Sequence, residues 1–412
     1  MRLADKDHRY LWHPFTQMKD WMSEEPVIIA SADGAVLRDT LGREYLDGNS
    51  SIWTNLHGHR HPKITAAIKD QLDRIAHSSF LGLSNVPSIE LAEKLCALSK
   101  LDRVFYSDDG STAVEAAIKM ALQYWRHRKQ PQRTKFVAFA NAYHGDTLGA
   151  VSVGGIDLFH ATFKPLLFDV TRVSRVAELP RGDDVAAVVI EPLIQGAAGM
   201  RLWPRGMLRE LRAWCDTSGA LLIADEVMTG FGRTGTMFAC EQENVRPDLM
   251  AVAKGLTGGY LPLAATLTTS SVFDAFLGEY AEFKTFFHGH SFTGNQLGCA
   301  AALANLRAFE EERTLKKNSV LGSQLADGVA ACRNLPSVVD VRCLGMIGAV
   351  EVGPYPIEAK MGIKICAAMR ERGVLTRPIG NVVVLMPPYC VTREELEKMT
   401  TVLRDSIRAV CG

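Results

Sequence analysis

The feature that most constrains the fold is an alternation, through the middle of the chain, of short apolar runs and longer segments with helical periodicity. Helical patterns such as 112–128 and 205–218 separate the apolar runs. The runs are almost continuously apolar, which is typical of strands buried on both faces of a sheet. They are 103–107, 135–140, 185–190, 220–224, 249–253 and 264–268. The alternation predicts an α/β fold with a mostly parallel sheet covered by helices.

A second unit is expected in the last quarter of the chain, where helical patterns dominate and short strands are interspersed. The helices are predicted at 296–313, 315–333, 359–373 and 392–410, and the strands at 338–342, 347–352 and 382–385. Thr392 and Glu395 have the spacing of a capping box at the start of the last helix. The first 45 residues contain a turn-and-strand pattern that can join this unit. We therefore expect a large domain at 46–309 and a smaller α+β domain built from 1–45 and 310–412.

Charge and cysteine usage exclude several classes of protein. Lysine plus arginine and aspartate plus glutamate both number 46, so the chain lacks the basic excess that nucleic acids and anionic membranes demand. No apolar run approaches the roughly 18 residues of a membrane span, and the charged start lacks the apolar core of a signal peptide. Nine scattered cysteines without a CxxC pair argue against a zinc ribbon or a disulfide framework. These observations favour a cytoplasmic enzyme acting on small molecules.

Ligands of open parallel sheets bind beyond the carboxyl ends of the strands, so the residues that follow each strand are the first candidates. After the strand at 103–107, Gly110 and Ser111 precede a strong helical pattern, and a helix N-terminus with a hydroxyl suits a phosphate. Thr112 and Glu115 have capping-box spacing and predict a helix start near Ser111. The two preceding aspartates would repel an anion unless they point away. An ordinary capped loop is the alternative interpretation.

Three further strand ends carry residues that suit pyridoxal phosphate (PLP). Asp225 ends one strand and can hold a protonated heterocyclic nitrogen, bind a metal or cap a turn. Lys254 follows the next strand, where burial would depress its pKa and make the amine nucleophilic, although a structural salt bridge is possible. Tyr143, beyond the strand at 135–140, offers a flat partner for a ring. Together, these strand ends match four features of PLP: its aldehyde, its ring nitrogen, its phosphate and its aromatic ring.

Other patterns compete with this interpretation. GFGRTG at 230–235 fits the dinucleotide fingerprint of an NAD-dependent oxidoreductase, but no suitable helix or acid-terminated strand follows. Histidines alternate in HGHRHP and FFHGHSF, where metal binding is conceivable and a role in loops or interfaces is favoured. Four aromatic residues can belong to the core or to a substrate pocket: Trp12, Phe15, Trp21 and Trp53. A non-enzymatic regulator is the remaining alternative, although no DNA-binding module or basic tail is visible.

The quoted motifs resemble those of the class III, fold type I PLP aminotransferases along nearly the whole chain. Within the class, WHPFTQM, HGHSFTGN and LTRPIG resemble the 7,8-diaminopelargonate synthases of biotin biosynthesis, which aminate 8-amino-7-oxononanoate to 7,8-diaminononanoate. The resemblance implies a mostly parallel seven-stranded sheet with flanking helices plus a smaller α+β domain. It also implies a homodimer with its active site at the subunit interface. Relatives acting on ornithine, acetylornithine or 4-aminobutyrate are the alternatives within the class.

The resemblance also implies roles for individual residues. The catalytic residues are Lys254, which binds the cofactor aldehyde covalently and moves the proton, Asp225, which keeps the ring nitrogen protonated, and Tyr143. Val227 and Tyr143 sandwich the cofactor ring. The phosphate is bound by Gly110 and Ser111, helped by Ser291 of the partner subunit. Glu191 at the cofactor and Arg233 are implied as supporting residues of the pocket.

On the substrate side, the resemblance implies that Arg377 receives the carboxylate of the keto substrate, with Trp53 and Gly289 in the same pocket. Three positions depart from the relatives that use S-adenosylmethionine as amino donor. Those relatives have a tyrosine, a tryptophan and a tyrosine where this chain has Phe15, Ile52 and Val384. The loss of two hydroxyls and one indole favours the subgroup that uses L-lysine as donor.

Overall fold

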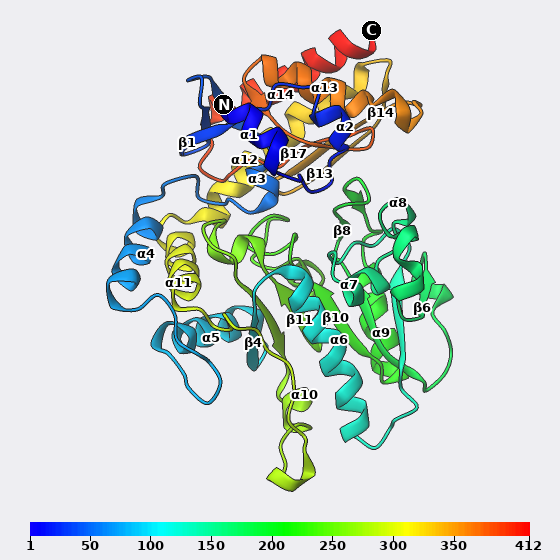
Figure 1. Ribbon diagram of the computed structural model, residues 1–412. Helices are drawn as coiled ribbons and strands as arrows, with labels where there is room; N and C mark the ends of the chain where they lie inside the picture. The colour runs from blue at the N-terminus through cyan, green and yellow to red at the C-terminus, as the bar shows by residue number, and fades with distance from the viewer.

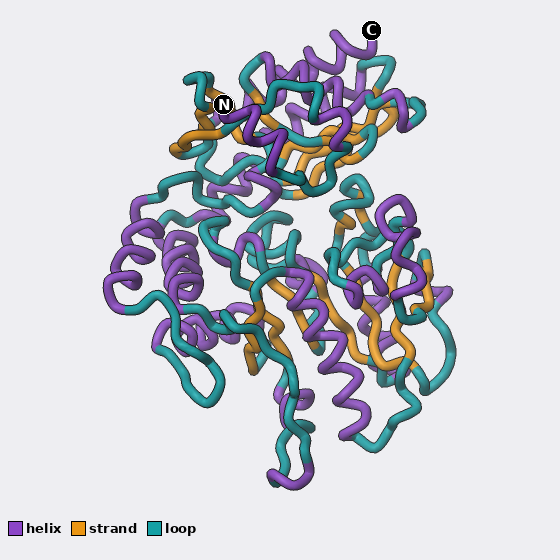
Figure 2. The backbone as a smooth tube through the Cα atoms, in the orientation of Figure 1, coloured by secondary structure: helices purple, strands orange, loops and turns teal.

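The computed structural model describes residues 1–412, and the centre of the lower lobe is a seven-stranded sheet (Figures 1 and 2). The neighbouring strands, in order, are β4 (Arg103–Ser107), β12 (Ala264–Thr268), β11 (Leu249–Val252), β10 (Leu221–Asp225), β7 (Val185–Ile190), β5 (Lys135–Phe139) and β6 (Val170–Val173). Only β12 runs antiparallel to its neighbours. The predicted α/β fold with a mostly parallel sheet is confirmed.

The structure has fourteen α-helices. They are α1 (Leu3–Tyr10), α2 (Met18–Trp21), α3 (Ser50–Trp53), α4 (Pro62–Arg74), α5 (Val86–Ser99), α6 (Gly110–His127), α7 (Leu148–Val153), α8 (Asp157–His160), α9 (Met207–Ser218), α10 (Ser270–Asp274), α11 (Gln296–Glu311), α12 (Thr314–Ala330), α13 (Met361–Glu371) and α14 (Arg393–Cys411). Of these, α6 and α9 cover opposite faces of this sheet, whereas α1, α2, α12, α13 and α14 belong to the upper lobe. Along β5, Phe136 and Ala138 join the apolar cluster of α6, whereas Val137 and Phe139 join the cluster of α9. Because successive side chains point to opposite faces, a strand covered on both sides must be apolar at every position.

The upper lobe in Figure 1 holds two smaller sheets and both chain termini. One sheet contains β13 (Val338–Leu344), β14 (Ile347–Val352), β17 (Val382–Leu385) and β16 (Pro378–Ile379), all antiparallel. The other pairs the N-terminal β1 (Ile29–Asp33), β2 (Val36–Asp39) and β3 (Glu44–Asp47) with β15 (Val374–Leu375). A hairpin of β8 (Ile194–Gln195) and β9 (Arg201–Leu202) completes the strands. Domain boundaries at 46 and 309 remain our proposal.

The capping prediction is confirmed at one helix and wrong at another. At α14, the Thr392 N–H donates to Glu395 and the Glu395 N–H donates to the Thr392 hydroxyl. At α6 the cap is Asp109, whose Oδ1 accepts from the Thr112 N–H at 2.9 Å. The helix therefore begins at Gly110, one residue before the predicted start, because an aspartate side chain reaches the free N–H groups as well as threonine does.

Some elements had no clear sequence signal. The edge strand β6 has the sequence VTRV, in which two polar residues interrupt the apolar pattern, and α4 and α5 were not predicted. No helix combines the length and the apolar character that crossing a membrane would require.

Candidate active site

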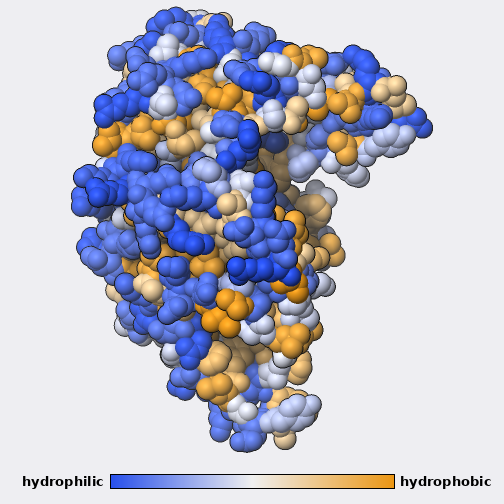
Figure 3. All heavy atoms as spheres, turned by 90° about the vertical axis from the view of Figure 1, so that its left-hand side faces the viewer, coloured by the Kyte–Doolittle hydropathy of each residue, from blue (hydrophilic) through white to orange (hydrophobic).

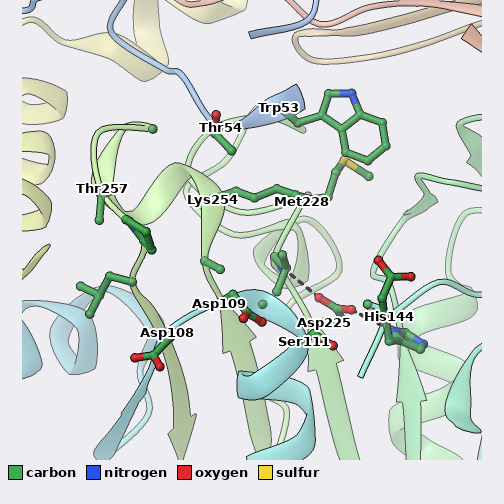
Figure 4. A pocket seen from close by; sticks show the side chains of 18 of the residues that line it. Trp53, Thr54, Asp108, Asp109, Ser111, His144, Asp225, Met228, Lys254 and Thr257 are labelled. Carbon is green, nitrogen blue, oxygen red and sulfur yellow. Dashed lines mark hydrogen bonds and ion pairs between the residues drawn. The ribbon is translucent and has the colours of Figure 1, made fainter. Parts of the chain in front are cut away.

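A cavity of about 720 Å³ opens beyond the carboxyl ends of the large sheet, on the side that faces the upper lobe. Its size lies in the usual range of small-molecule sites. Figure 4 shows Lys254, Trp53 and Met228 at one side of this cavity, and Asp225, Ser111 and the acidic residues of the β4–α6 turn at the other. The residues that follow β4, β5, β10 and β11 all contribute to the lining, as the strand-end argument predicted.

Asp225, the last residue of β10, presents its carboxylate to this cavity and is 5% exposed. Its Oδ1 accepts from the Val227 N–H at 3.0 Å, and its Oδ2 accepts from His144 Nδ1 at 2.7 Å. Burial by itself disfavours the imidazolium, but the hydrogen bond and the charge of Asp225 outweigh it and raise the pKa of His144. The imidazolium and the carboxylate therefore stabilise each other as an ion pair.

Glu226, the next residue, lies in a different environment. Its carboxylate is fully buried beneath the following loop and accepts from the Ala239 N–H at 3.0 Å and the Cys240 N–H at 2.8 Å. Burial raises the pKa of Glu226. Of the two acids at the end of β10, one therefore faces the cavity and the other holds the loop that follows GFGRTG.

Lys254 begins the short 3₁₀ turn after β11, with a left-handed backbone (φ +42°). Burial lowers the pKa of Lys254, and the charges of Asp225 and Glu191 offset this only in part. Its Nζ lies 4.8 Å from the centroid of the Trp53 ring, and Figure 4 draws no hydrogen bond or ion pair to it. A half-buried amine with a depressed pKa and no ion pair is a suitable nucleophile, so the salt-bridge interpretation does not hold.

The start of α6 forms a narrow pocket. A Cβ added at Gly110 would lie 2.6 Å from the Val227 side chain, so only glycine fits there. The Ser111 hydroxyl lies 2.8 Å from the Thr147 hydroxyl and accepts from the Thr147 N–H at 3.0 Å. Asp109 uses its carboxylate to cap the helix. The helix N-terminus and two neighbouring hydroxyls can receive a phosphate group.

Tyr143 and Glu191 form another wall. The Tyr143 hydroxyl donates to Asp146 Oδ2 at 2.7 Å, and its ring lies nearly parallel to His160, with 6.2 Å between the ring centroids. Glu191 accepts from the Gly196 N–H at 2.8 Å and from the Tyr143 N–H at 3.2 Å. Burial raises the pKa of Glu191 to about 7.

Several predicted site residues lie outside this cavity. Arg377 is exposed, and its Nη2 donates to the Phe15 carbonyl at 2.7 Å. Phe15 is itself exposed, as is Ile52. Gly289 and Ser291 lie on the exposed loop before α11. The single chain thus brings together the cofactor-binding candidates and leaves part of the predicted substrate pocket at the surface.

Two more predicted residues are buried beside the cavity. Val384 is fully buried in the apolar cluster that also contains Trp53. Arg233 is 1% exposed and donates to backbone carbonyls. The GFGRTG segment leads into a 3₁₀ helix at Ala239–Glu243, not into an α-helix that could bind a dinucleotide phosphate.

Sequence reasoning missed His144, although it follows Tyr143 in the motif NAYHGDT. Asp225 and His144 lie 81 residues apart in the chain, and they meet because β10 and β5 both end at the same edge of the sheet, on either side of β7. The one available signal was that a histidine followed a predicted strand at the edge where the other candidates gather.

Comparisons with known proteins identify the family. The class-III aminotransferase family matches residues 18–407. The chain is 52% identical to the adenosylmethionine-8-amino-7-oxononanoate aminotransferase of Nitratidesulfovibrio vulgaris, over 99% of this chain and 82% of the relative.

Solved structures agree with this match. The crystal structure of the Methanocaldococcus jannaschii adenosylmethionine-8-amino-7-oxononanoate aminotransferase superimposes with a TM-score of 0.96 at 43% identity, covering 99% of each chain. A PLP-bound amine transaminase from an uncultivated Pseudomonas species has a TM-score of 0.91 at 33% identity, covering 97% of this chain and 99% of that one. The chain therefore belongs to the class-III aminotransferases and is a transaminase that uses pyridoxal phosphate.

Proposed function

We propose that this enzyme transfers an amino group to 8-amino-7-oxononanoate and produces 7,8-diaminononanoate, a step of biotin biosynthesis. The observation that carries the proposal is the match, over 99% of the chain, to a relative named for this acceptor. The cavity supports it, because an amine with a depressed pKa, a buried carboxylate and a helix N-terminus meet there.

The residues of the cavity fit the cofactor. We propose that Lys254 binds the PLP aldehyde, that Asp225 holds the pyridine nitrogen and that Gly110 and Ser111 receive the phosphate. The bare backbone at Gly110 supports this fit, since a Cβ there would strike the Val227 side chain and narrow the cavity at the helix N-terminus. Val227 and Tyr143 would then flank the ring. PLP, when bound, supplies an electron sink that stabilises negative charge on the substrate carbon.

The reaction also needs groups of this chain to hold and move protons. With the cofactor bound, the amine of Lys254 would remove the proton from the donor carbon that bears nitrogen. The same amine would hold this proton until it is returned. The hydrogen bond from His144 would hold the Asp225 carboxylate in place beside the ring nitrogen. The second half-reaction runs these proton transfers in the opposite direction on the keto acceptor.

The acceptor is a long apolar chain that ends in a carboxylate, and we propose that Arg377 binds this carboxylate. The bond to the Phe15 carbonyl uses one Nη2 hydrogen of Arg377 and leaves other guanidinium N–H groups for a carboxylate. Trp53 provides an aromatic wall beside Lys254, since its ring faces the lysine amine.

We further propose that a second copy of the chain completes the site. Gly289 and Ser291 lie outside the cavity of their own chain. Large apolar side chains are exposed on the same loop and on the segment between α4 and α5: Leu81, Leu83, Val86, Phe287 and Phe292. Figure 3 views the molecule from the α4 and α5 side and shows apolar atoms gathered on the lower part of that face. A homodimer interface would cover them and bring Ser291 of the partner subunit to the phosphate.

The amino donor divides this function into two versions. We favour L-lysine, because Phe15 and Ile52 offer no hydroxyl or second indole to S-adenosylmethionine and Val384 is buried. If the partner subunit covers Phe15 and Ile52, polar contacts at these positions would be buried and worth about 1–3 kcal/mol each, so their loss would weaken binding of that donor. S-adenosylmethionine remains the second candidate, because the name of the 52% identical relative includes it.

The test is a pair of half-reactions with the purified holoenzyme. Each donor is added alone, and conversion of the bound cofactor to its amine form is followed by absorbance; 8-amino-7-oxononanoate is then added and the diamine is measured. We expect rapid conversion with L-lysine and formation of the diamine. Conversion by S-adenosylmethionine alone would reverse the donor assignment. Transamination with ornithine, acetylornithine or 4-aminobutyrate, without formation of the diamine, would contradict the assignment of 8-amino-7-oxononanoate as the acceptor.

A further inference from the structure

The helix-like turn α3, residues 50–53, has an unusual backbone. All four residues are left-handed, with φ values of 46° at Ser50, 49° at Ser51, 67° at Ile52 and 71° at Trp53. None is glycine. In this region the Cβ atom of an L-residue crowds the following carbonyl, so left-handed residues normally occur singly. The β-branched Ile52 is an especially poor residue for it. Such a conformation persists only where surrounding groups enforce it.

On one side, the carboxylate of Asp47 enforces the turn. It is 2% exposed, and its Oδ1 accepts from the N–H groups of Asn49 at 3.2 Å and Ser51 at 3.0 Å. Its Oδ2 accepts from the Ser51 hydroxyl at 2.9 Å. Above the turn, the Ser50 hydroxyl donates to the Met386 carbonyl at 2.6 Å. The N–H groups at the start of the turn are therefore bound by a single buried acid.

On the other side, Arg233 collects the carbonyl groups. Nη2 donates to the carbonyls of Trp53 at 3.4 Å and Asn55 at 3.0 Å, and Nη1 donates to the Pro387 carbonyl at 2.9 Å. The guanidinium also lies 4.9 Å from the centroid of the Tyr389 ring. A fully buried cation without an ion pair is expensive to maintain. Its carbonyl contacts come from both ends of the sequence, which indicates a role in fixing backbone.

The turn carries Trp53 into the cavity. The indole Nε1 donates to Asn49 Oδ1 at 2.9 Å, and the ring face lies 4.8 Å from Lys254 Nζ. Trp53 lines the cavity but is only 9% exposed. Right-handed backbone at 50–53 would point its side chain elsewhere, because the Cβ direction follows φ and ψ.

We propose that Asp47 and Arg233 are positioning residues that hold residues 50–53 in a left-handed turn and so fix Trp53 opposite Lys254, as a rigid wall beside the reacting carbon of the substrate. The inference rests on the aminotransferase activity and not on the choice of acceptor or donor. If either half of this clamp is weakened, Trp53 becomes mobile and the substrate is bound less well, while the cofactor still binds through Lys254.

A double-mutant cycle on the holoenzyme tests the inference. Arg233→Lys keeps the charge but loses the fork that reaches three carbonyls. We expect Arg233→Lys to raise KM for the amino donor about tenfold, with a smaller change in kcat. In a protein that already carries Trp53→Ala, the same substitution should raise KM by less than about twofold. The expected result is thus strong coupling between the two sites. Independent effects that multiply in the double variant would overturn the proposal.

Arg133 offers a matched control. It is also buried, donates to two carbonyls, those of Val185 at 2.8 Å and Ser218 at 2.9 Å, and lies against the ring of Trp125. It sits at the opposite end of the sheet, where β7 begins. Arg133→Lys should lower the melting temperature without changing KM or coupling to Trp53→Ala. A KM change as large as that of Arg233→Lys would show a general effect of losing a buried arginine and would overturn the assignment.

A second measurement tests the turn itself and does not need Arg233→Lys to fold. Ile52→Gly and Ile52→Ala both remove the exposed side chain, but only glycine adopts the left-handed backbone freely. The glycine variant should melt about 2–4 °C above the alanine variant, the reverse of the usual order within a helix or strand. A higher melting temperature for Ile52→Ala would contradict an enforced left-handed turn.

Discussion

The two ends of the active-site cavity are built in different ways. At the cofactor end, Asp225 ends one strand of the large sheet and is buried, and Lys254 follows the neighbouring strand and is half-buried. At the proposed substrate end, Phe15, Ile52 and Arg377 lie outside the cavity of the single chain and are exposed. The cofactor end therefore takes its geometry from a rigid sheet, whereas the substrate end depends on loops and on contacts between remote segments.

This difference has a chemical consequence. Groups at the strand ends cannot move far, so substitutions there should change the chemical step. Groups at the substrate end act mainly by binding, and their substitution should change KM. The predictions below test this division.

The largest effect is expected for Lys254→Ala at the cofactor end. Without the amine, the protein should lose more than about a thousandfold in kcat and lose the absorption band of the covalently bound cofactor. Absorbance spectra and single-turnover assays measure both. Lys164→Ala, at an exposed lysine, is the control and should behave as wild type. Normal turnover by Lys254→Ala would refute the assignment.

Asp225→Asn should come next, with a loss of about a hundredfold in kcat, because a preorganised charge beside the cofactor is removed. The neighbouring acid provides the comparison. Glu226→Gln should lower the free energy of unfolding by about 1–3 kcal/mol through its buried hydrogen bonds, with little change in kcat per folded enzyme. Chemical denaturation and steady-state kinetics separate the two. Equal kinetic losses would show that the two carboxylates do not have separate roles.

At the substrate end, Arg377→Ala should raise KM for the keto acceptor by about 10- to 100-fold and leave kcat nearly unchanged, since a charged hydrogen bond is worth about 1.5–3 kcal/mol. Arg201→Ala serves as a control, because Arg201 is an exposed arginine outside the cavity. If Arg377→Ala lowered kcat without affecting KM, the division between the two ends would fail.

The pKa of Glu191 predicts a dependence of stability on pH. Burial raises this pKa from 4.5 to about 7, so the folded protein binds the proton more tightly than the unfolded chain does. The resulting stabilisation is complete below pH 4.5 and is lost as the pH rises to about 7. As the pH rises across this window, the wild-type apoenzyme should lose stability relative to the Glu191→Gln apoenzyme. The change in the relative free energy of unfolding should be on the order of 2 kcal/mol. A constant difference would contradict the shift.

The smallest effect is expected for Ser291→Ala, which would remove one of several hydrogen bonds proposed for the phosphate and should weaken PLP binding about fivefold. Mixed dimers make the test sharper. In a mixed dimer, one chain is wild type and its partner carries both Lys254→Ala and Ser291→Ala. The only active site then combines Lys254 of the wild-type chain with the alanine that replaces Ser291 of the partner subunit. The PLP affinity of that site should fall, whereas Ser291→Ala on the other chain should leave it unchanged.

Much of the cofactor end was predictable. Lys254, Asp225, Tyr143 and Gly110 each follow an apolar run that the sequence marks as a buried strand. The edge strand β6 was not predictable, because a strand with polar residues on its exposed side lacks the continuous apolar signal. The cap of α6 was assigned to the wrong residue, since several polar side chains near a helix start compete for the same N–H groups.

The sequence by itself determined which chemical groups follow the strands, because a strand buried on both faces must be apolar and a parallel sheet gathers its carboxyl ends at one edge. Only the tertiary structure decided that Asp225 faces the cavity while Glu226 does not, and that His144 pairs with Asp225. It also decided the left-handed turn under Trp53 and the contact of Arg377 with Phe15, 362 residues away. These features depend on contacts between segments far apart in the chain, which no local pattern of residue types specifies.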